Sequence, residues 1–348
     1  MKKILLSGVK PTGRPHIGNY FGAMKQFVDL QNDYKSFVFL ANYHALTGVQ
    51  DAKSLGDDTL GLAIDYLAIG LNPKNVTLFL QSDVPEVTEL AWIFNCITTM
   101  PYLMRAHAFK DALSKSARIT YSSMPSEYTV DTAVRTQGIE AMREVNVGTF
   151  DYPLLMAADI LIQDADVVPV GADQKQHVEY ARDTAEKFNR IFGDTFKLPE
   201  PLILPEVKTV IGTDGRKMSK SYGNTIELFA SDQDIRSGVM SIPTDSKGVN
   251  EPKNPDECNV FALHKLFSAE DLSELKKRYI DGGIGYKESK DILVENMIRF
   301  VSPLRENRTL IEKNPDDVKK ILRDGGEIAR ERARLKMIEI RKKVGLTI

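Results

Sequence analysis

The chain has 348 residues, of which 42% are hydrophobic and 27% charged, and its formal net charge is −2. This balance is typical of a globular protein, and the length allows two domains of ordinary size. The charge excludes a protein that is strongly basic over its whole surface, although a local basic face can still bind RNA. Only two cysteines occur, Cys96 and Cys258, so we expect no zinc site, no iron–sulfur cluster and no disulfide framework.

We expect no targeting segment in the first residues. The apolar run at 4–6 ends at Ser7 and Gly8, which is too short for the apolar core of a secretory signal. No stretch of 18 apolar residues occurs anywhere, so we expect no membrane partner. Together with the low cysteine count, this predicts a cytoplasmic protein.

Short apolar runs alternate with amphipathic helices over the first half of the chain. Alternation of this length predicts a parallel sheet with helices on its faces. We therefore expect an α/β fold, a Rossmann-like doubly wound parallel sheet, with ligands at one edge of the sheet where the strands end. Strands are predicted at 3–9, 36–40, 76–80 and 167–170, and helices from about 18, from about 57, over 152–162 and from 173.

The strand pattern ends near residue 195, and from 232 onward the chain is predicted to be mostly amphipathic helix. We therefore expect a catalytic domain over 1–195 and a second, C-terminal helical domain over 196–348. An irregular stretch at 112–140, rich in Ser, Thr and Met, is predicted to be an insertion in the first domain. Trp92 is expected to pack in the core.

A glycine-bearing turn, PTGRPHIGN at 11–19, joins the first strand to the first helix. Glycines let a nucleotide approach the backbone, and a helix N-terminus offers N–H groups to phosphate. His16 can donate a hydrogen bond to phosphate oxygens as charge develops on them. A plain turn with an incidental histidine is the alternative, but the spacing P-x-G-x-x-H-x-G-N favours a functional site.

A second motif, KMSKS at 217–221, follows a loop that opens at Asp214 and Gly215. Its two lysines, three residues apart, can close on a triphosphate and neutralise the leaving pyrophosphate as point charges. A solvated basic loop is the usual meaning of such a pair. The motif alone does not decide between the two.

Taken together, HIGN at 16–19 and KMSKS at 217–221 resemble the two signatures of the class I aminoacyl-tRNA synthetases. The resemblance spans essentially the whole chain and implies that both motifs surround one ATP. Asn19 stands where many members carry a second histidine, a departure typical of the tryptophan-specific enzymes. The implied catalytic residues are His16, Asn19, Lys217 and Lys220, and the implied ATP contacts also include Lys10, Thr12, Gly18, Met218, Ser219 and Ser221.

The helix predicted at 152–162 resembles the amino-acid-binding helix of the bacterial tryptophan-specific members. Tyr152, Met156, Asp159 and Ile160 share one face of this helix. A buried carboxylate needs a donor, and an indole N–H is a donor without acceptor capacity, so Asp159 suits it. Met156 and Ile160 would pack on the ring. A core helix whose aspartate caps a neighbouring loop is the alternative.

Tyrosine is the nearest competing specificity. In tyrosine-specific members a glutamine usually stands where Met156 is, and a thioether cannot donate to a phenol oxygen. This favours tryptophan, although Asp159 suits either ligand. A tyrosine–tRNA ligase and, further away, a non-catalytic RNA-binding paralogue remain the alternatives.

A fourth element, VPVGADQ at 168–174, is predicted as a strand, a glycine turn and a helix start. By resemblance, Gly171 and Asp173 meet the ATP, and Gln174 meets the amino group of the substrate. An aspartate that only caps the helix is the alternative for Asp173. Further pocket residues implied by the resemblance are Gly8, which leaves room beside the substrate, His44, for which a structural role is the alternative, and Val168 and Val170.

The resemblance implies a two-step reaction. ATP, with Mg²⁺, activates L-tryptophan to tryptophanyl-adenylate with release of pyrophosphate, and the adenylate then charges tRNA(Trp). The helical domain is implied to recognise the anticodon, and the enzyme to work as a homodimer.

Overall fold

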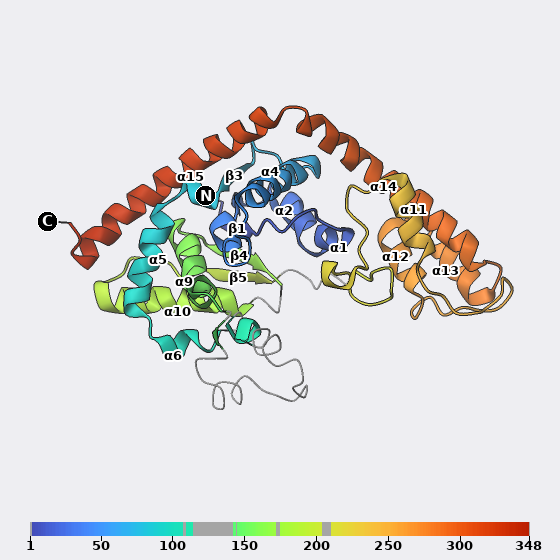
Figure 1. The fold of residues 1–348 in the computed structure, drawn as a ribbon, viewed down its shortest axis with the longest axis horizontal. Coiled ribbons are helices and arrows are strands. Elements are labelled where there is room, and N and C mark those ends of the chain that lie inside the picture. Colours follow the sequence, from blue (N-terminus) through green and yellow to red (C-terminus); the bar gives the residue numbers. More distant parts are fainter. Residues whose placement is uncertain are drawn as a thin grey trace.

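The computed structural model describes residues 2–106, 109–113, 142–143, 145–171, 175–203 and 210–347. A parallel sheet with strand order β3-β2-β1-β4-β5 lies at its centre (Figure 1). This order belongs to a doubly wound sheet and confirms the predicted Rossmann-like α/β fold. The strands are β1 (Ile4–Val9), β2 (Lys35–Leu40), β3 (Val76–Leu80), β4 (Val167–Val170) and β5 (Glu200–Ile203).

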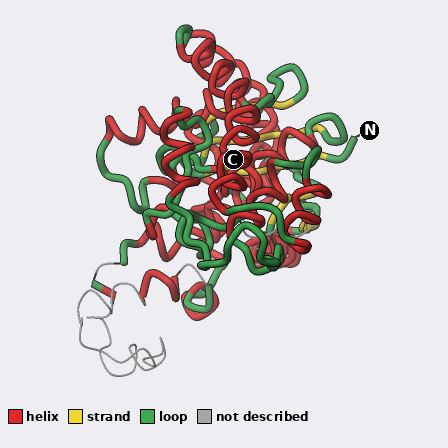
Figure 2. Tube along the Cα trace, turned by 90° about the vertical axis from the view of Figure 1, so that its right-hand side faces the viewer, coloured by secondary structure: helices red, strands yellow, loops and turns green. Residues whose placement is uncertain are grey.

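Successive side chains of β2, an interior strand of the sheet, belong to two separate apolar layers. Phe37 and Phe39 belong to one buried cluster, and Val38 and Leu40 belong to the other. This follows from the alternation of side chains along a strand, and it explains why the strand is apolar without interruption. Figure 2 shows the strands enclosed by helices. The first cluster packs under α5 (Glu86–Ile97), α9 (Val147–Ile162) and α10 (Lys175–Phe192), and the second under α2 (Lys25–Leu30) and α4 (Ala52–Ala68).

Two sequence expectations about these elements are wrong. β5 lies beyond residue 195, where no further strand was expected. Its four residues, EPLI, are exposed or only half-buried, so they carry a weak apolar signal, and a proline is tolerated there because β5 is an edge strand. The helix expected from about 57 begins at Ala52, because Asp51 caps it by accepting from the Ser54 N–H, 2.6 Å away.

Trp92 is also not where the sequence analysis placed it. The core face of α5 is formed by Val87, Leu90 and Phe94, whereas Trp92 is 70% exposed. The expectation that it packs in the core is therefore wrong. Both sides of α5 carry large apolar residues, so the sequence does not reveal which side is buried.

The C-terminal region is helical, as predicted. A third buried cluster joins several of its helices to the segment that carries KMSKS. The last helix, α15 (Pro315–Val344), leaves this group and runs back along the β3 edge of the sheet, forming an arch with α14 (Figure 1). The division into 1–195 and 196–348 stays a prediction. The other helices of this region are α11 (Asp232–Met240), α12 (Asn259–Phe267), α13 (Leu272–Asp281) and α14 (Tyr286–Glu312).

Close packing of α15 on β3 depends on two glycines. A Cβ atom at Gly325 would lie 2.0 Å from the Leu78 carbonyl oxygen, and one at Gly326 would lie 2.7 Å from Asp83 Oδ2. Glycine weakens a helix by about 1 kcal/mol relative to alanine, so its presence here reflects the close approach. α15 thereby covers an edge strand that would otherwise be open. Within the described part of the chain, every helix is too short or too polar to cross a lipid bilayer.

Candidate active site

His16 and Asn19 lock the turn after β1 into one conformation. The Asn19 N–H donates to His16 Nδ1 at 3.2 Å, and the His16 N–H donates to Asn19 Oδ1 at 3.0 Å, which caps α1 (Ile17–Asn19) from both sides. Because Nδ1 accepts a hydrogen bond, the ring proton lies on Nε2. A Cβ atom at Gly18 would lie 2.9 Å from the His16 ring. Any residue other than glycine would therefore collide with the ring in its present position.

His16 is a neutral donor at physiological pH. Burial lowers the pKa of His16 to about 4, and the positive charge of Lys220 adds to this shift. The imidazole therefore offers an N–H group without a charge of its own. Such a group can stabilise negative charge that develops on a phosphate oxygen without taking part in proton transfer.

The Asn224 side chain is hydrogen-bonded to the KMSKS loop and to the residues before it. Its side-chain oxygen accepts from the Ser219 N–H at 2.8 Å, and its Nδ2 donates to the Lys217 carbonyl oxygen at 3.1 Å and to Asp214 Oδ1 at 2.6 Å. The side chain is buried, so the loop folds around it. Asn224 lies three residues after the KMSKS motif, and the sequence analysis gives it no role.

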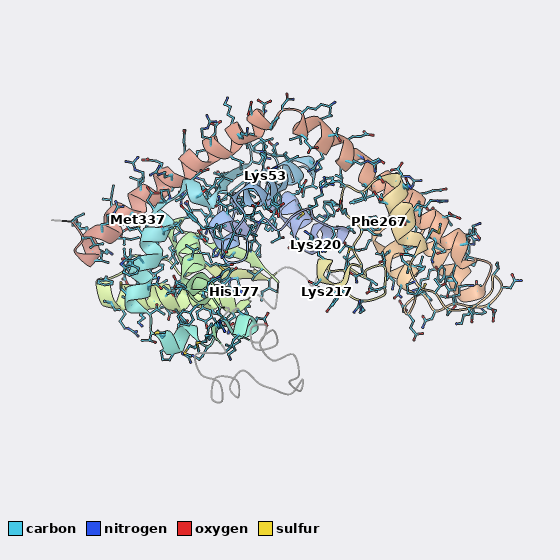
Figure 3. The ribbon with its side chains drawn as sticks, in the orientation of Figure 1. Lys53, His177, Lys217, Lys220, Phe267 and Met337 are labelled. Atoms are coloured by element: carbon cyan, nitrogen blue, oxygen red, sulfur yellow. The ribbon has the colours of Figure 1, made fainter. Side chains whose placement is uncertain are left out.

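The fold brings the two signature motifs into contact, although they are about two hundred residues apart. The Ile17 N–H donates to the Ile226 carbonyl oxygen at 3.0 Å, and Met218 shares a buried cluster with Ile17. Lys220, in the 3₁₀ turn η5 (Lys220–Tyr222), donates to the Thr12 carbonyl oxygen at 2.6 Å. Figure 3 shows Lys217 and Lys220 where the sheet meets the C-terminal helices.

Of the residues predicted to meet ATP, these contacts bring Thr12, Gly18, Asn19, Met218 and Lys220 together. Burial lowers the pKa of Lys220, while nearby carboxylates, Asp58 first, oppose the shift. Lys217 and Ser221 are exposed, and Ser219 is half-buried. Lys10 lies further along the same edge and donates to Thr47 Oγ1 at 3.0 Å.

A second group of residues surrounds the buried carboxylate of Asp159 on α9. His44 Nε2, from α3 (Asn42–Ala45), lies 3.1 Å from Asp159 Oδ2. Gln81 Nε2 donates to both carboxylate oxygens, at 3.0 Å to Oδ1 and 2.8 Å to Oδ2. Burial raises the pKa of Asp159, and the hydrogen bonds from His44 and Gln81 oppose this shift.

The predicted pocket residues of α9 gather on the same side. The Tyr152 ring lies 4.5 Å from the His44 ring, measured between centroids. Met156 and Val170 are partly buried against the apolar cluster that contains Ile160 and Val168. The structure therefore places the Tyr152 ring beside His44 and the buried Asp159 carboxylate, on the helix that also carries Met156.

Four predicted site residues need separate mention. Gly8 does not leave open space, because a Cβ atom there would lie 2.3 Å from Phe39 Cζ, so glycine makes room for the Phe39 ring. Gly171 follows β4 directly and is exposed. Asp173 and Gln174 lie outside the described residues, and their roles stay predictions.

Gln81 is the pocket residue that sequence reasoning missed. It follows β3 directly, at the carboxyl end of the strand, where ligands bind in sheets of this kind. A polar residue at that position is a weak signal by itself. Its partner, Asp159, is 78 residues away, and only the fold brings the two together.

Comparison with known proteins places this geometry in a family. The family described as tRNA synthetases class I (W and Y) matches residues 2–302. The chain belongs to this family of class I tRNA synthetases. Both signature motifs of the family resemblance lie within the matched range, and they form the contacts described above.

Relatives within the class I synthetases carry the tryptophan specificity in their names. A tryptophan–tRNA ligase from Fusobacterium nucleatum is 47% identical over 343 residues, covering 98% of this chain and 97% of the relative. The crystal structure of tryptophanyl-tRNA synthetase from Campylobacter jejuni complexed with ADP and tryptophan is 42% identical, with a TM-score of 0.85, and covers 98% and 99% of the two chains. A tyrosyl-tRNA synthetase from Archaeoglobus fulgidus, 18% identical with a TM-score of 0.60 over 88% of this chain and 90% of its own, shares the fold.

Proposed function

We propose that this class I synthetase is a tryptophan–tRNA ligase. It activates L-tryptophan with ATP to tryptophanyl-adenylate and transfers the amino acid to tRNA(Trp). The observation that carries this specificity is the buried Asp159 carboxylate on α9, three residues after Met156, so that an acceptor and an apolar thioether lie on one face of the helix. The names of relatives at 42–47% identity support the same substrate.

In the first step the tryptophan carboxylate attacks the α-phosphorus of ATP, and the bond to pyrophosphate breaks. This chemistry depends on positioning and on charge neutralisation more than on a general base. The neutral His16 donates from Nε2 to the phosphate, and Lys217 and Lys220 neutralise the leaving pyrophosphate. Mg²⁺ enters as part of the MgATP substrate, because this ion keeps phosphate and water ligands.

The remaining assignments follow from the family resemblance. Gly171 and Asp173 contact the nucleotide, and Gln174 contacts the amino group of tryptophan. In the pocket, Asp159 accepts from the indole N–H. The C-terminal helices read the anticodon of tRNA(Trp), and the enzyme works in the cytoplasm, where charged tRNA is used.

The enzyme is also proposed to act as a homodimer, joined through the surface that carries Trp92. This residue is 70% exposed on α5, and Met100 on the following helix, α6 (Met100–Leu103), is 67% exposed. Exposed apolar side chains mark an interaction site where they lie close together, and Trp92 and Met100 are eight residues apart on consecutive helices. A second copy of the chain is the occupant that the family resemblance implies.

Trp92→Glu should raise the dissociation constant of the dimer about 30-fold or more, because a buried interface tryptophan is a typical hot spot. Sedimentation over a concentration series measures this. Ile328→Glu is the matched control, since Ile328 is 52% exposed on α15. A dimer that Trp92→Glu leaves intact, or a wild-type protein that is monomeric, would show that this surface joins no second copy.

The substrate itself is tested by ATP–pyrophosphate exchange with each of the twenty amino acids. Exchange reports adenylate formation and needs no tRNA. It therefore separates the amino-acid specificity from the assignment of the tRNA.

A further inference from the structure

The orientation of the Gln81 amide is fixed from its own oxygen. Gln81 begins the 3₁₀ turn η2 (Gln81–Asp83) and is 1% exposed. Its Oε1 accepts from the backbone N–H groups of Tyr43 and His44, at 3.1 Å and 3.2 Å, in the first turn of α3. Because these two groups can only donate, the other end of the amide must be its NH₂ group. That NH₂ group faces Asp159.

In the described part of the chain, three elements present groups to Asp159. His44 Nε2 on α3 lies 3.1 Å from one carboxylate oxygen, Tyr152 lies on α9 itself, and Gln81 on η2 donates to both oxygens. Gln81 is thus the donor that contacts the whole carboxylate. A carboxylate held by donors on both oxygens cannot rotate without losing hydrogen bonds, and losing a hydrogen bond to a buried charged group is costly.

We infer that Gln81 is a positioning residue for amino-acid selection, holding the Asp159 carboxylate in the orientation in which it accepts from the indole N–H of tryptophan. The inference rests on the proposed function, because it assumes that Asp159 receives the substrate side chain. Gln81 acts through Asp159 and needs no contact with tryptophan of its own. Gln81 also connects the end of β3 and the first turn of α3 to α9, the helix that carries Asp159. The position of the Asp159 carboxylate therefore depends on the sheet.

Gln81→Glu isolates the donor function. One oxygen of the new carboxyl group can still accept from the Tyr43 and His44 N–H groups, but the NH₂ donor is gone. Above neutral pH two carboxylates then face each other, and the KM for tryptophan should rise about tenfold while kcat changes little. At lower pH the Glu side chain takes a proton and donates an O–H to Asp159, so the KM should return toward the wild-type value.

The readout is the ratio of the variant KM to the wild-type KM between pH 6 and pH 8.5, measured by ATP–pyrophosphate exchange. Both KM values change in the same way as tryptophan and ATP titrate, so this effect cancels in the ratio. A falling ratio toward pH 6 supports the positioning role, because a merely structural defect would not recover with acid. A ratio near one at every pH, or a raised ratio that does not change with pH, overturns it.

Gln31→Glu is the matched control. Gln31 is also buried, its Oε1 accepts from the Asn72 N–H at 2.8 Å, and its Nε2 donates to the Val28 carbonyl oxygen at 2.9 Å. It lies before β2, at the end of the strand opposite the pocket, so its KM ratio should stay near one. Gln81→Met is the second variant, for use if Gln81→Glu does not fold. It loses the donor without adding a charge, and it also loses the oxygen that accepts from the Tyr43 and His44 N–H groups. Its KM should be raised about tenfold or more at all pH values.

Different results would contradict the proposed function and the role of Gln81. If the wild-type enzyme shows no exchange with tryptophan, the proposed function is wrong and the role of Gln81 is overturned with it. If wild-type exchange is strong but Gln81→Met leaves the KM for tryptophan unchanged, only the role of Gln81 is overturned.

Discussion

Lys220→Ala lowers the rate of tryptophanyl-adenylate formation about 100- to 1000-fold, the usual effect of removing one group that stabilises transition-state charge. Binding of tryptophan should change little, because the lysine acts on charge that appears only as pyrophosphate leaves. The position supports this role, since Lys220 lies beside the His16 turn and donates to the Thr12 carbonyl oxygen at 2.6 Å. Single-turnover kinetics measures the rate, and equilibrium binding measures the affinity.

Lys53→Ala is the control for Lys220→Ala. Lys53 is an exposed lysine on α4, away from the signature motifs (Figure 3), and its loss should leave both quantities unchanged. Equal losses of rate and of tryptophan affinity in Lys220→Ala would contradict the assigned role, because they would show that the lysine supports the ground state as well.

Asp159→Asn raises the KM for tryptophan about 10- to 100-fold and weakens the preference for tryptophan over tyrosine. An amide oxygen is a weaker, uncharged acceptor for the indole N–H, and the amide N–H₂ group must meet the donors of His44 and Gln81. The variant should keep most of its kcat at saturating tryptophan, because Asp159 is remote from the reacting phosphate in the proposed mechanism.

Asp291→Asn provides the comparison for Asp159→Asn. Asp291 lies on α14 and accepts from Arg236 at 2.9 Å, so the same change of chemistry occurs outside the pocket. Its KM for tryptophan should equal that of the wild type. An unchanged KM in Asp159→Asn would mean that the carboxylate does not receive the substrate side chain.

The sheet was predictable where its strands are buried on both faces. β2 is the clearest case, since its residues from Ser36 to Leu40 are all buried and almost all apolar. β5 was missed because an edge strand of four partly exposed residues leaves no apolar run. The start of α4 was missed because its first turn is exposed and only the cap at Asp51 marks it.

Local motifs were sufficient to predict that HIGN and KMSKS lie together. The residues of HIGN and KMSKS are adjacent in sequence, and the fold brings the two motifs together as the resemblance implied. The contacts that hold the amino-acid pocket were not predictable in the same way. Gln81 and His44 reach Asp159 across 78 and 115 positions, and such a pairing has no local pattern.

The most direct test of the central claim is amino-acid-dependent ATP–pyrophosphate exchange with the wild-type enzyme and each of the twenty amino acids. The account predicts strong exchange with tryptophan and far weaker exchange with tyrosine, because Met156 offers no donor to a phenol oxygen and Asp159 suits an indole N–H. Exchange driven more strongly by tyrosine than by tryptophan would contradict it.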